Sequence, residues 1–267
     1  MRQLIGRQYP SDQTIAFPRG NWRTNAAETA TRLSDTPNPL LVMGHFRFGI
    51  HNYLPQPDEW TYITVLRHPI RRVISQYSNV IYGQNPDERQ LKLRDIDIVT
   101  FAGTLGHGER MTRWLAGLGM TDDPYKTTKD PKPLPANALE RAKQNLRTRF
   151  ACVGLLEEFP ATALMMKQSL GWKSAHYSIQ NVSRSGNRAS VPPDVYAQLE
   201  KACATDLALY QFAQTLFEAQ KQAYGSTLER DIADLHRDNQ WHTRVNTVKR
   251  FLTKRGFRQA FKRIRRS

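Results

Sequence analysis

Residues 60–77, WTYITVLRHPIRRVISQY, carry the strongest local pattern in the chain. Residues 60–66 are β-branched, aromatic or leucine, which is the composition of a buried strand. Apolar residues then recur at positions 70, 73, 74 and 77, which is the spacing of one face of a helix. Pro69 suits the first position of that helix because its missing N–H would have no helical partner anyway. The stretch therefore predicts a strand that leads through a short turn into a helix.

The sequence on either side predicts further strands and helices in alternation. Apolar runs of strand length occupy residues 40–45 and 150–156, and a shorter one occupies residues 14–17. Helical patterns cover residues 1–9, 24–33, 96–119, 136–146, 160–170 and 192–224. The pattern over residues 96–119 is interrupted by glycines, and the last has a break near residues 205–206. Residues 121–135 and 173–191 are predicted loops. Alternating strands and helices indicate an α/β fold with parallel strands.

Charge is the unusual feature of the composition. The chain has 267 residues, of which 39% are hydrophobic, enough to bury a core. Its 39 Lys and Arg against 24 Asp and Glu give a net charge of +15. Such an excess predicts an anionic partner, which could be nucleic acid, phosphate, sulfated sugar or acidic lipid.

Most of that charge lies in residues 241–267, which hold ten Lys and Arg and no acidic residue. Apolar residues in this tail fall at helical spacing, with Gly256 as a break. A basic amphipathic helix could lie on a membrane surface or a polyanion. It could equally pack its apolar stripe on the protein and leave its basic side chains solvated. We therefore predict an α/β domain over residues 1–224 and a basic helical extension over residues 225–267.

Several protein classes are disfavoured by the sequence. The two cysteines, Cys152 and Cys203, cannot form a disulfide framework, and both are predicted to be buried apolar residues. No Cys/His cluster has the spacing of a zinc site, so no metal is expected. No apolar run approaches the ~20 residues of a membrane span, and the first residues lack a secretory apolar segment. We expect a cytoplasmic protein, and peripheral membrane contact through residues 241–267 is one of the alternatives for the tail.

Residues 66–77 also have the features of a phosphate-binding site. Arg67 follows a buried strand, and open α/β sheets bind ligands at the carboxyl ends of their strands. The helix that follows presents its N-terminus there, which favours an anion, and an arginine can bind phosphate through two hydrogen bonds. Ser75 lies two turns into the helix. We expect Arg71 and Arg72 to be surface arginines and His68 to be a turn residue.

The pattern Leu-Arg-x-Pro-x-x-Arg-x-x-Ser-x-Tyr at residues 66–77 resembles the 3′-phosphate-binding motif of sulfotransferases. These enzymes use 3′-phosphoadenosine 5′-phosphosulfate (PAPS). More narrowly, the chain resembles the carbohydrate-type family that includes heparan sulfate 2-O-sulfotransferase and bacterial members. Residues 44–46 (GHF), 111–117, 150–172 and 206–213 resemble family segments in the same order. The resemblance covers residues 1–217.

The resemblance implies a three-layer, P-loop-NTPase-like parallel sheet flanked by helices. It implies that Arg67 and Ser75 bind the 3′-phosphate of the co-substrate PAPS, and that the polar loop with Asn181 and Arg184 covers the nucleotide. His45 would be the general base that takes the proton of a hydroxyl acceptor, which is a carbohydrate in this family. An imidazole that titrates near neutrality suits that task. His51, six residues later, competes for the same role.

One part of the family pattern is missing. The family has a Pro-Lys-Thr-Gly-Thr-Thr-like loop between its first strand and first helix, which holds the 5′-phosphosulfate much as a P-loop does. This sequence contains no such loop, and residues 1–10 resemble the helix that follows it. We therefore expect the first strand and the 5′ loop to be absent, nucleotide binding to be weak, and turnover to be very low.

Two alternatives to an active sulfotransferase follow. One is a catalytically impaired, sulfotransferase-like remnant that binds polysaccharide, acidic lipid or nucleic acid through its basic surface. The other is a dedicated nucleic-acid-binding protein, which the charge alone suggests and which no nucleic-acid-binding motif in the sequence supports.

Overall fold

The computed structural model describes residues 2–16, 31–32, 35–36, 38–44, 46–82, 95–104, 106–118, 133–177 and 191–241. The strands are β1 (Thr14–Ala16), β2 (Leu41–Met43), β3 (Tyr62–Leu66) and β4 (Phe150–Leu155). The helices include α1 (Arg2–Gly6), α3 (Pro69–Tyr82), α5 (Ile98–Ala102), α6 (Arg110–Leu115), α7 (Ala138–Arg149), α8 (Phe159–Ser169), α9 (Pro193–Ala202) and α10 (Ala204–Tyr224). Residues 228–241 are also helical, and short 3-10 helices lie at Ser11–Gln13, Ile50–Tyr53, Pro57–Glu59 and His107–Glu109. The chain is therefore mixed α/β.

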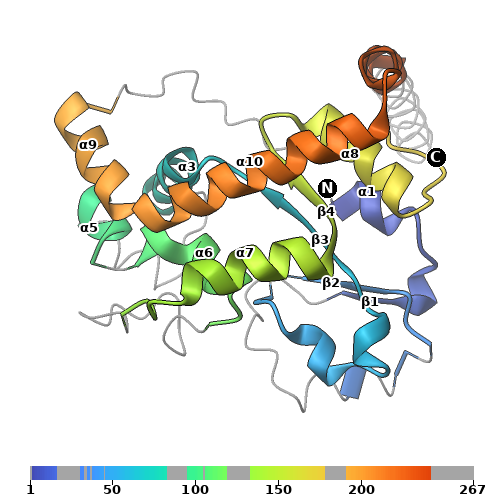
Figure 1. Cartoon of the computed structure of the whole chain (residues 1–267), viewed down its shortest axis with the longest axis horizontal. Helices are drawn as coiled ribbons and strands as arrows, with labels where there is room; N and C mark the ends of the chain where they lie inside the picture. Colours follow the sequence, from blue (N-terminus) through green and yellow to red (C-terminus); the bar gives the residue numbers. More distant parts are fainter. Residues whose placement is uncertain are drawn as a thin grey trace, which may run out of the picture.

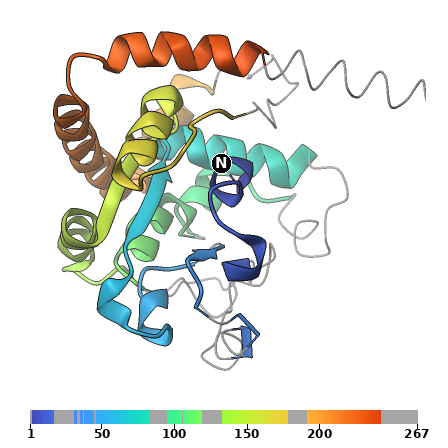
Figure 2. The same cartoon turned by 90° about the vertical axis from the view of Figure 1, so that its right-hand side faces the viewer.

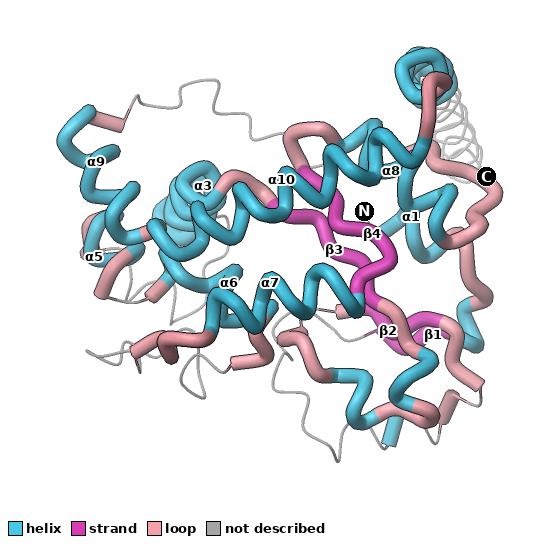
Figure 3. Tube along the Cα trace, in the orientation of Figure 1, coloured by secondary structure: helices cyan, strands magenta, loops and turns pink. Residues whose placement is uncertain are grey.

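The described strands form two separate parallel pairs. β3 pairs with β4, with Val65 opposite Gly154, and β1 pairs with β2, with Ile15 opposite Val42. In Figure 3 the two pairs lie beside one another, with helices around them. The prediction of parallel strands is confirmed. The described strands do not join into one continuous sheet.

β4 is the buried centre of the larger pair. From Cys152 to Leu155 every residue is buried, because β4 has β3 beside it and helices packed against it. Helix α8 approaches so closely that a Cβ added at Gly154 would lie 2.2 Å from Cγ2 of Thr162. The hydroxyl of Thr162 donates to the carbonyl of Leu155 at 2.9 Å and accepts from its N–H at 3.0 Å. A glycine is therefore required on this strand for the helix to dock.

Helices flank β3 and β4 on two sides. Figures 1 and 2 place α7 and α10 on one side of these strands and α1 and α3 on the other. Leu4 and Ile5 of α1 and Phe217 of α10 belong to the same large hydrophobic core as β4. The strands are therefore enclosed by apolar faces of helices, which is the usual arrangement around parallel strands.

A second, smaller core joins α3, α5 and α9. Ile70 and Val73 of α3 pack with Phe101 of α5 and Leu199 of α9. Helix α5 begins after Asp97, whose carboxylate accepts the N–H groups of Val99 and Thr100, each at 2.9 Å. The hydrogen bond from the Thr100 hydroxyl, together with these two backbone bonds, lowers the pKa of Asp97. This N-cap explains why so short a helix starts at residue 98.

The helical residues 228–241 pack on the large core. Leu228 and Leu235 are each 5% exposed and belong to the same cluster as β4. Asn239 accepts the N–H of Tyr177 at 2.8 Å through its side-chain oxygen. Gly225, with φ of +97°, separates this helix from α10. The predicted boundary at residues 224–225 is thus a turn between two packed helices. Residues 242–267 of the predicted basic tail lie outside the described residues.

Most predicted elements are present, with shifted ends. The predicted helix at residues 96–119 is divided into α5, a 3-10 turn and α6, since glycines interrupt it. The predicted break near residues 205–206 lies at Cys203. Of the predicted helix at residues 24–33, only residues 31–32 are described. Cys152 and Cys203 are both 0% exposed, as predicted, and burial raises the pKa of their thiols to about 12 and about 11.

Candidate functional site

A cavity of about 950 Å³ lies between β2 and β3. Its walls include every residue from 41 to 44 and every residue from 60 to 66. Side chains of a strand alternate between its two faces, so a cavity on one face would be lined by every second residue. Consecutive lining residues instead indicate that the cavity follows the edges of both strands. The gap between the two strand pairs is therefore an open space bounded by backbone edges.

The cavity is positively charged. Arg47, Arg72 and Arg110 line it, and its described lining contains no Asp or Glu. The guanidinium of Arg110 lies 4.8 Å from the ring centroid of Trp114, a cation–π contact that holds both side chains in place. Aromatic rings on the wall and several arginines suit a ligand that has both an anionic group and a flat or apolar part.

His51 and Tyr62 form a hydrogen-bonded pair on the cavity wall. Nδ1 of His51 lies 2.6 Å from Oη of Tyr62, and the two rings meet edge to face. The same Oη accepts the backbone N–H groups of Gly49 and His51, each at 3.2 Å. Phe48 and Phe150 pack around the pair, with Phe48 5.3 Å and 5.0 Å from the His51 and Tyr62 rings. His51 is 9% exposed.

Burial keeps both members of this pair neutral. Desolvation and the positive charge of Arg149 lower the pKa of His51, and Asp58 opposes this weakly. Desolvation raises the pKa of Tyr62 despite its backbone hydrogen bonds. At neutral pH the site therefore contains an uncharged imidazole and an uncharged phenol.

The turn that carries His51 depends on Gly49. Gly49 has φ of +110°, which a residue with a Cβ rarely adopts, and it precedes the 3-10 helix Ile50–Tyr53. This conformation directs the N–H groups of Gly49 and His51 toward Tyr62. Phe48, one residue earlier, donates its N–H to the carbonyl of Trp114 at 2.8 Å. Hydrogen bonds therefore hold the turn on both sides of Gly49, at Phe48 before it and at His51 after it.

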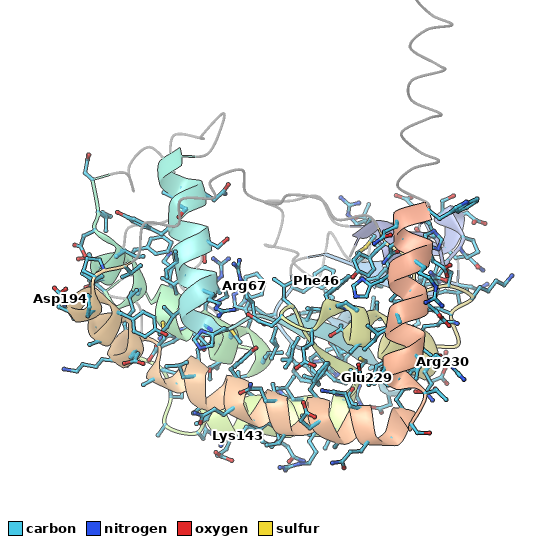
Figure 4. All side chains as sticks on the ribbon, turned by 90° about the horizontal axis from the view of Figure 1, so that it is seen from above. Phe46, Arg67, Lys143, Asp194, Glu229 and Arg230 are labelled. Carbon is cyan, nitrogen blue, oxygen red and sulfur yellow. The ribbon has the colours of Figure 1, made fainter. Side chains whose placement is uncertain are left out.

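Arg67 lies where the sequence predicts it, at the carboxyl end of β3 and before the first turn of α3. Its side chain is half-buried, and Figure 4 places it beside α3 on the side toward Phe46. The neighbouring N–H of His68 donates to the carboxylate of Glu157 at 3.0 Å, and the hydroxyl of Tyr210 donates to the other oxygen at 2.9 Å. A carboxylate therefore already contacts the backbone at the start of α3.

Arg72 is not a surface arginine, so that prediction is wrong. Its guanidinium donates to the carbonyl of His107 and lies 3.4 Å from the carboxylate of Asp206. Asp206 is fully buried and also accepts the N–H groups of Met111 and Thr112, at 2.9 Å and 2.8 Å. The buried carboxylate attracts the arginine inward. Arg71, by contrast, is exposed as predicted.

Burial also perturbs the ionisable groups behind the cavity. Desolvation raises the pKa of Asp206, while Arg72 and the donors of α6 counteract that rise. Desolvation lowers the pKa of His107 to about 3, with help from the charges of Arg110 and Arg72. The ring of His107 stacks on Phe101, with centroids 3.9 Å apart. His107 is therefore a neutral, aromatic core residue.

The remaining predicted site residues are not brought together by the described structure. Ser75 lies on an exposed face of α3, while Arg72, Gln76 and Asn79 form the face toward the cavity. His45, Asn181 and Arg184 lie outside the described residues. The neighbours of His45 in the chain, Gly44 and Phe46, both line the cavity. His68 is a turn residue as predicted, and its ring packs edge-on against Tyr210.

The sequence segments quoted for the family resemblance contact one another through polar side chains, of which Asp206 is fully buried and Glu157 is exposed. Asp206 connects three of them, since it binds Arg72 of residues 66–77 and Thr112 of residues 111–117. Tyr210 binds Glu157 of the segment 150–172. Widely separated segments thus meet around the carboxyl ends of β3 and β4.

Sequence reasoning missed several residues of this site. The pattern of residues 60–66 places Tyr62 only in a strand, and no pattern in the sequence gives Arg110 or Asp206 a role. The signal for Asp206 was available, because an Asp in an otherwise apolar helical segment must find hydrogen-bond donors if it is buried. No local signal identified Tyr62, because its partner lies in another turn of the chain.

Comparisons with known proteins add no relative: no protein-family model and no curated protein matches this chain. Over the described part of the chain, no helix combines the length and the apolar character needed to cross a membrane. The same residues contain no group of three or more His, Cys, Asp or Glu that could hold a metal ion.

Proposed function

We propose that this protein is a sulfotransferase of the PAPS-dependent type, acting on a hydroxyl acceptor that is a carbohydrate. The observation that carries the proposal is the position of Arg67 at the carboxyl end of β3, directly before α3 and one residue after Leu66, which lines the arginine-containing cavity. An arginine and a helix N-terminus together form a binding site for a phosphate group.

The proposal includes a P-loop-NTPase-like parallel sheet to which both strand pairs would belong. Two parallel pairs separated by a cavity along their edges support it, because one more strand between β2 and β3 would join them into a single sheet. Neighbouring strands lie about 4.8 Å apart, so one inserted strand requires two flanking strands at about twice that spacing. The basic extension beyond residue 241 would add a polyanion or membrane contact.

The donor groups present fit one end of PAPS. Arg67 and the first turn of α3 would hold the 3′-phosphate, with Ser75 as a further ligand. Glu157 opposes this fit, since its carboxylate already accepts the N–H of His68. For the 5′-phosphosulfate the sequence contains no glycine-rich loop with a lysine. Asn181 and Arg184 would cover the nucleotide.

In the proposed reaction the acceptor hydroxyl loses its proton to His45 as its oxygen forms a bond to sulfur. PAPS supplies the sulfuryl group, and the bond from sulfur to the nucleotide phosphate breaks. Such transfers depend mainly on positioning and on stabilisation of charge, by analogy with phosphoryl transfer. Without a lysine at the leaving oxygen, we expect binding through the 3′-phosphate and very low turnover.

Thermal stabilisation by adenosine 3′,5′-bisphosphate tests the proposal. We expect the nucleotide to raise Tm of the full chain, because a ligand that binds only the folded state stabilises it. Arg67→Ala should abolish the shift. Arg71→Ala is the matched control, since Arg71 is an exposed arginine four residues away, and it should retain the shift.

A polyanion-binding protein would behave differently. Its binding to heparin or DNA would weaken steeply with salt, and the nucleotide would leave Tm unchanged. That pair of results would replace the sulfotransferase proposal with the alternative of a polyanion-binding remnant.

A further inference from the structure

We propose that His51 is a neutral hydrogen-bond donor, with its proton fixed on Nε2, to a sulfate-like oxyanion bound in the cavity between β2 and β3. The proposal deepens the proposed function and rests on it for the identity of the oxyanion as a sulfuryl or sulfate group. It separates the role of His51 from that of His45, which remains the proposed base.

Counting protons at Tyr62 determines the tautomer. The phenol oxygen has two lone pairs and one O–H. The N–H groups of Gly49 and His51 both point at this oxygen at 3.2 Å and use its two lone pairs. The phenol can then contact Nδ1 of His51, 2.6 Å away, only by donating its own proton. Nδ1 is therefore the acceptor, and the ring proton of neutral His51 is on Nε2.

The surroundings hold the imidazole in this orientation. Phe48, Tyr62 and Phe150 pack on one another, and the first two contact the His51 ring. His51 is 9% exposed, and its ring lines the cavity. Because Nδ1 is engaged by Tyr62, Nε2 on the other side of the ring is the nitrogen available to a ligand.

The charges that act on His51 favour a neutral ring, and the arginines that line the cavity favour an anionic ligand. Arg149 and Asp58, which form an ion pair at 3.3 Å, are the charged groups that act on the imidazole, and the arginine has the larger effect. The cavity itself carries Arg47, Arg72 and Arg110 and no carboxylate among its described lining residues. Arg72 is paired with the buried carboxylate of Asp206, so the positive charge that this cavity offers an oxyanion comes from Arg47 and Arg110, and neutral His51 adds an N–H donor.

Sulfate-like groups match this donor set. Their oxygens accept hydrogen bonds without needing to be protonated, and bonds to a charged acceptor are about twice as strong as neutral ones. During sulfuryl transfer His51 would keep its proton throughout. It would stabilise negative charge on a non-bridging oxygen, while the acceptor proton goes to the separate base.

Nitrogen NMR of histidine side chains in the full chain tests the tautomer without any ligand. The wild type should show His51, assigned by its loss in His51→Gln, with Nε2 protonated and Nδ1 unprotonated. Tyr62→Phe removes the donor to Nδ1 and should produce a mixture of the two tautomers. A wild type with Nδ1 protonated would overturn the proposal.

Titration with inorganic sulfate tests the ligand. His51→Leu should weaken sulfate binding about tenfold or more, because it removes a hydrogen bond to a charged group. His51→Gln places an amide N–H near the position of Nε2 and should bind within about threefold of the wild type. Equal weakening in both variants would refute a donor role, as would no sulfate binding in the wild type.

The sulfotransferase proposal and the proposed role of His51 can be tested independently. Adenosine 3′,5′-bisphosphate binding depends on Arg67 and should be retained in His51→Leu. If the nucleotide does not bind but the tautomer and sulfate results are as expected, the sulfotransferase assignment fails and the oxyanion site stands. If the nucleotide binds and sulfate does not, only the role of His51 fails.

Discussion

At the residue scale, burial sets the charge state of His107. The ring is 1% exposed and lies almost parallel to Phe101. Its pKa is about 3, because desolvation and the charges of Arg110 and Arg72 disfavour the imidazolium form. In the unfolded chain the same group titrates near ~6.5. Between the folded pKa of about 3 and the unfolded pKa near ~6.5, this imidazole therefore binds a proton in the unfolded chain but not in the folded protein.

This difference predicts a pH-dependent stability. The contribution of His107 is fully present above pH ~6.5 and is lost as pH falls toward 3, at up to ~1.4 kcal/mol per pH unit. We expect His107→Phe to keep the stacking on Phe101 and to remove this dependence. The free energy of unfolding of the variant minus that of the wild type should therefore be roughly 2–3 kcal/mol larger at pH 4.5 than at pH 7.5. Urea denaturation of the variant and the wild type at pH 7.5 and at pH 4.5 measures this difference.

The exposed His236 provides the control. His236→Phe should leave the pH dependence of unfolding as it is in the wild type. If His107→Phe and the wild type lose stability in parallel as pH falls, His107 is not the group responsible.

At the element scale, Asp206 holds three helices together. Its carboxylate lies in α10, binds the first turn of α6 through Met111 and Thr112, and faces Arg72 of α3. The hydroxyl of Thr112 adds a further bond at 2.8 Å. A buried charge that accepts several donors is costly to remove, because each donor is left unpaired away from water.

We therefore expect Asp206→Ala to lower the free energy of unfolding by about 3–5 kcal/mol. Asp194→Ala is the matched control, because Asp194 is an exposed Asp in the first turn of α9, and it should cost at most about 1 kcal/mol. Guanidinium denaturation of both variants makes the comparison. Similar losses in the two variants would contradict a structural role for the buried carboxylate.

At the scale of the whole molecule, the two strand pairs differ in how firmly they are held. β4 is buried between β3 and the helices, and its core includes Leu146, Leu209 and Phe217. β1 and β2 have three residues each, and Ile15 alone among those six is buried. The cavity separates β2 from β3, so β2 gains no hydrogen bonds from the larger pair.

Hydrogen exchange should reveal this difference. We expect the amides of β4, such as those of Val153 and Leu155, to exchange only through unfolding of the whole protein. The amides of the β1–β2 pair should exchange through local opening with a much smaller free energy. Mass spectrometry or NMR of the full chain measures both. Equal protection of the two pairs would mean that they open as one unit.

The sequence alone determined the local elements. The strand–turn–helix of residues 60–82, β4, α7 and α8 follow from residue composition and periodicity within each segment, and so do the buried cysteines. These features depend on neighbours a few residues apart, which a linear pattern contains. The placement of Arg67 before α3 follows in the same way.

Only the tertiary structure decided which polar groups meet. Arg72 faces Asp206 across 134 positions of sequence, and Glu157 meets Tyr210 across 53. His51 and Tyr62 come together only because the turn at Gly49 folds back on β3. The cavity exists because two strand edges face one another without pairing. Such contacts are set by burial and by the need to pair buried polar groups, and these depend on the folded chain as a whole.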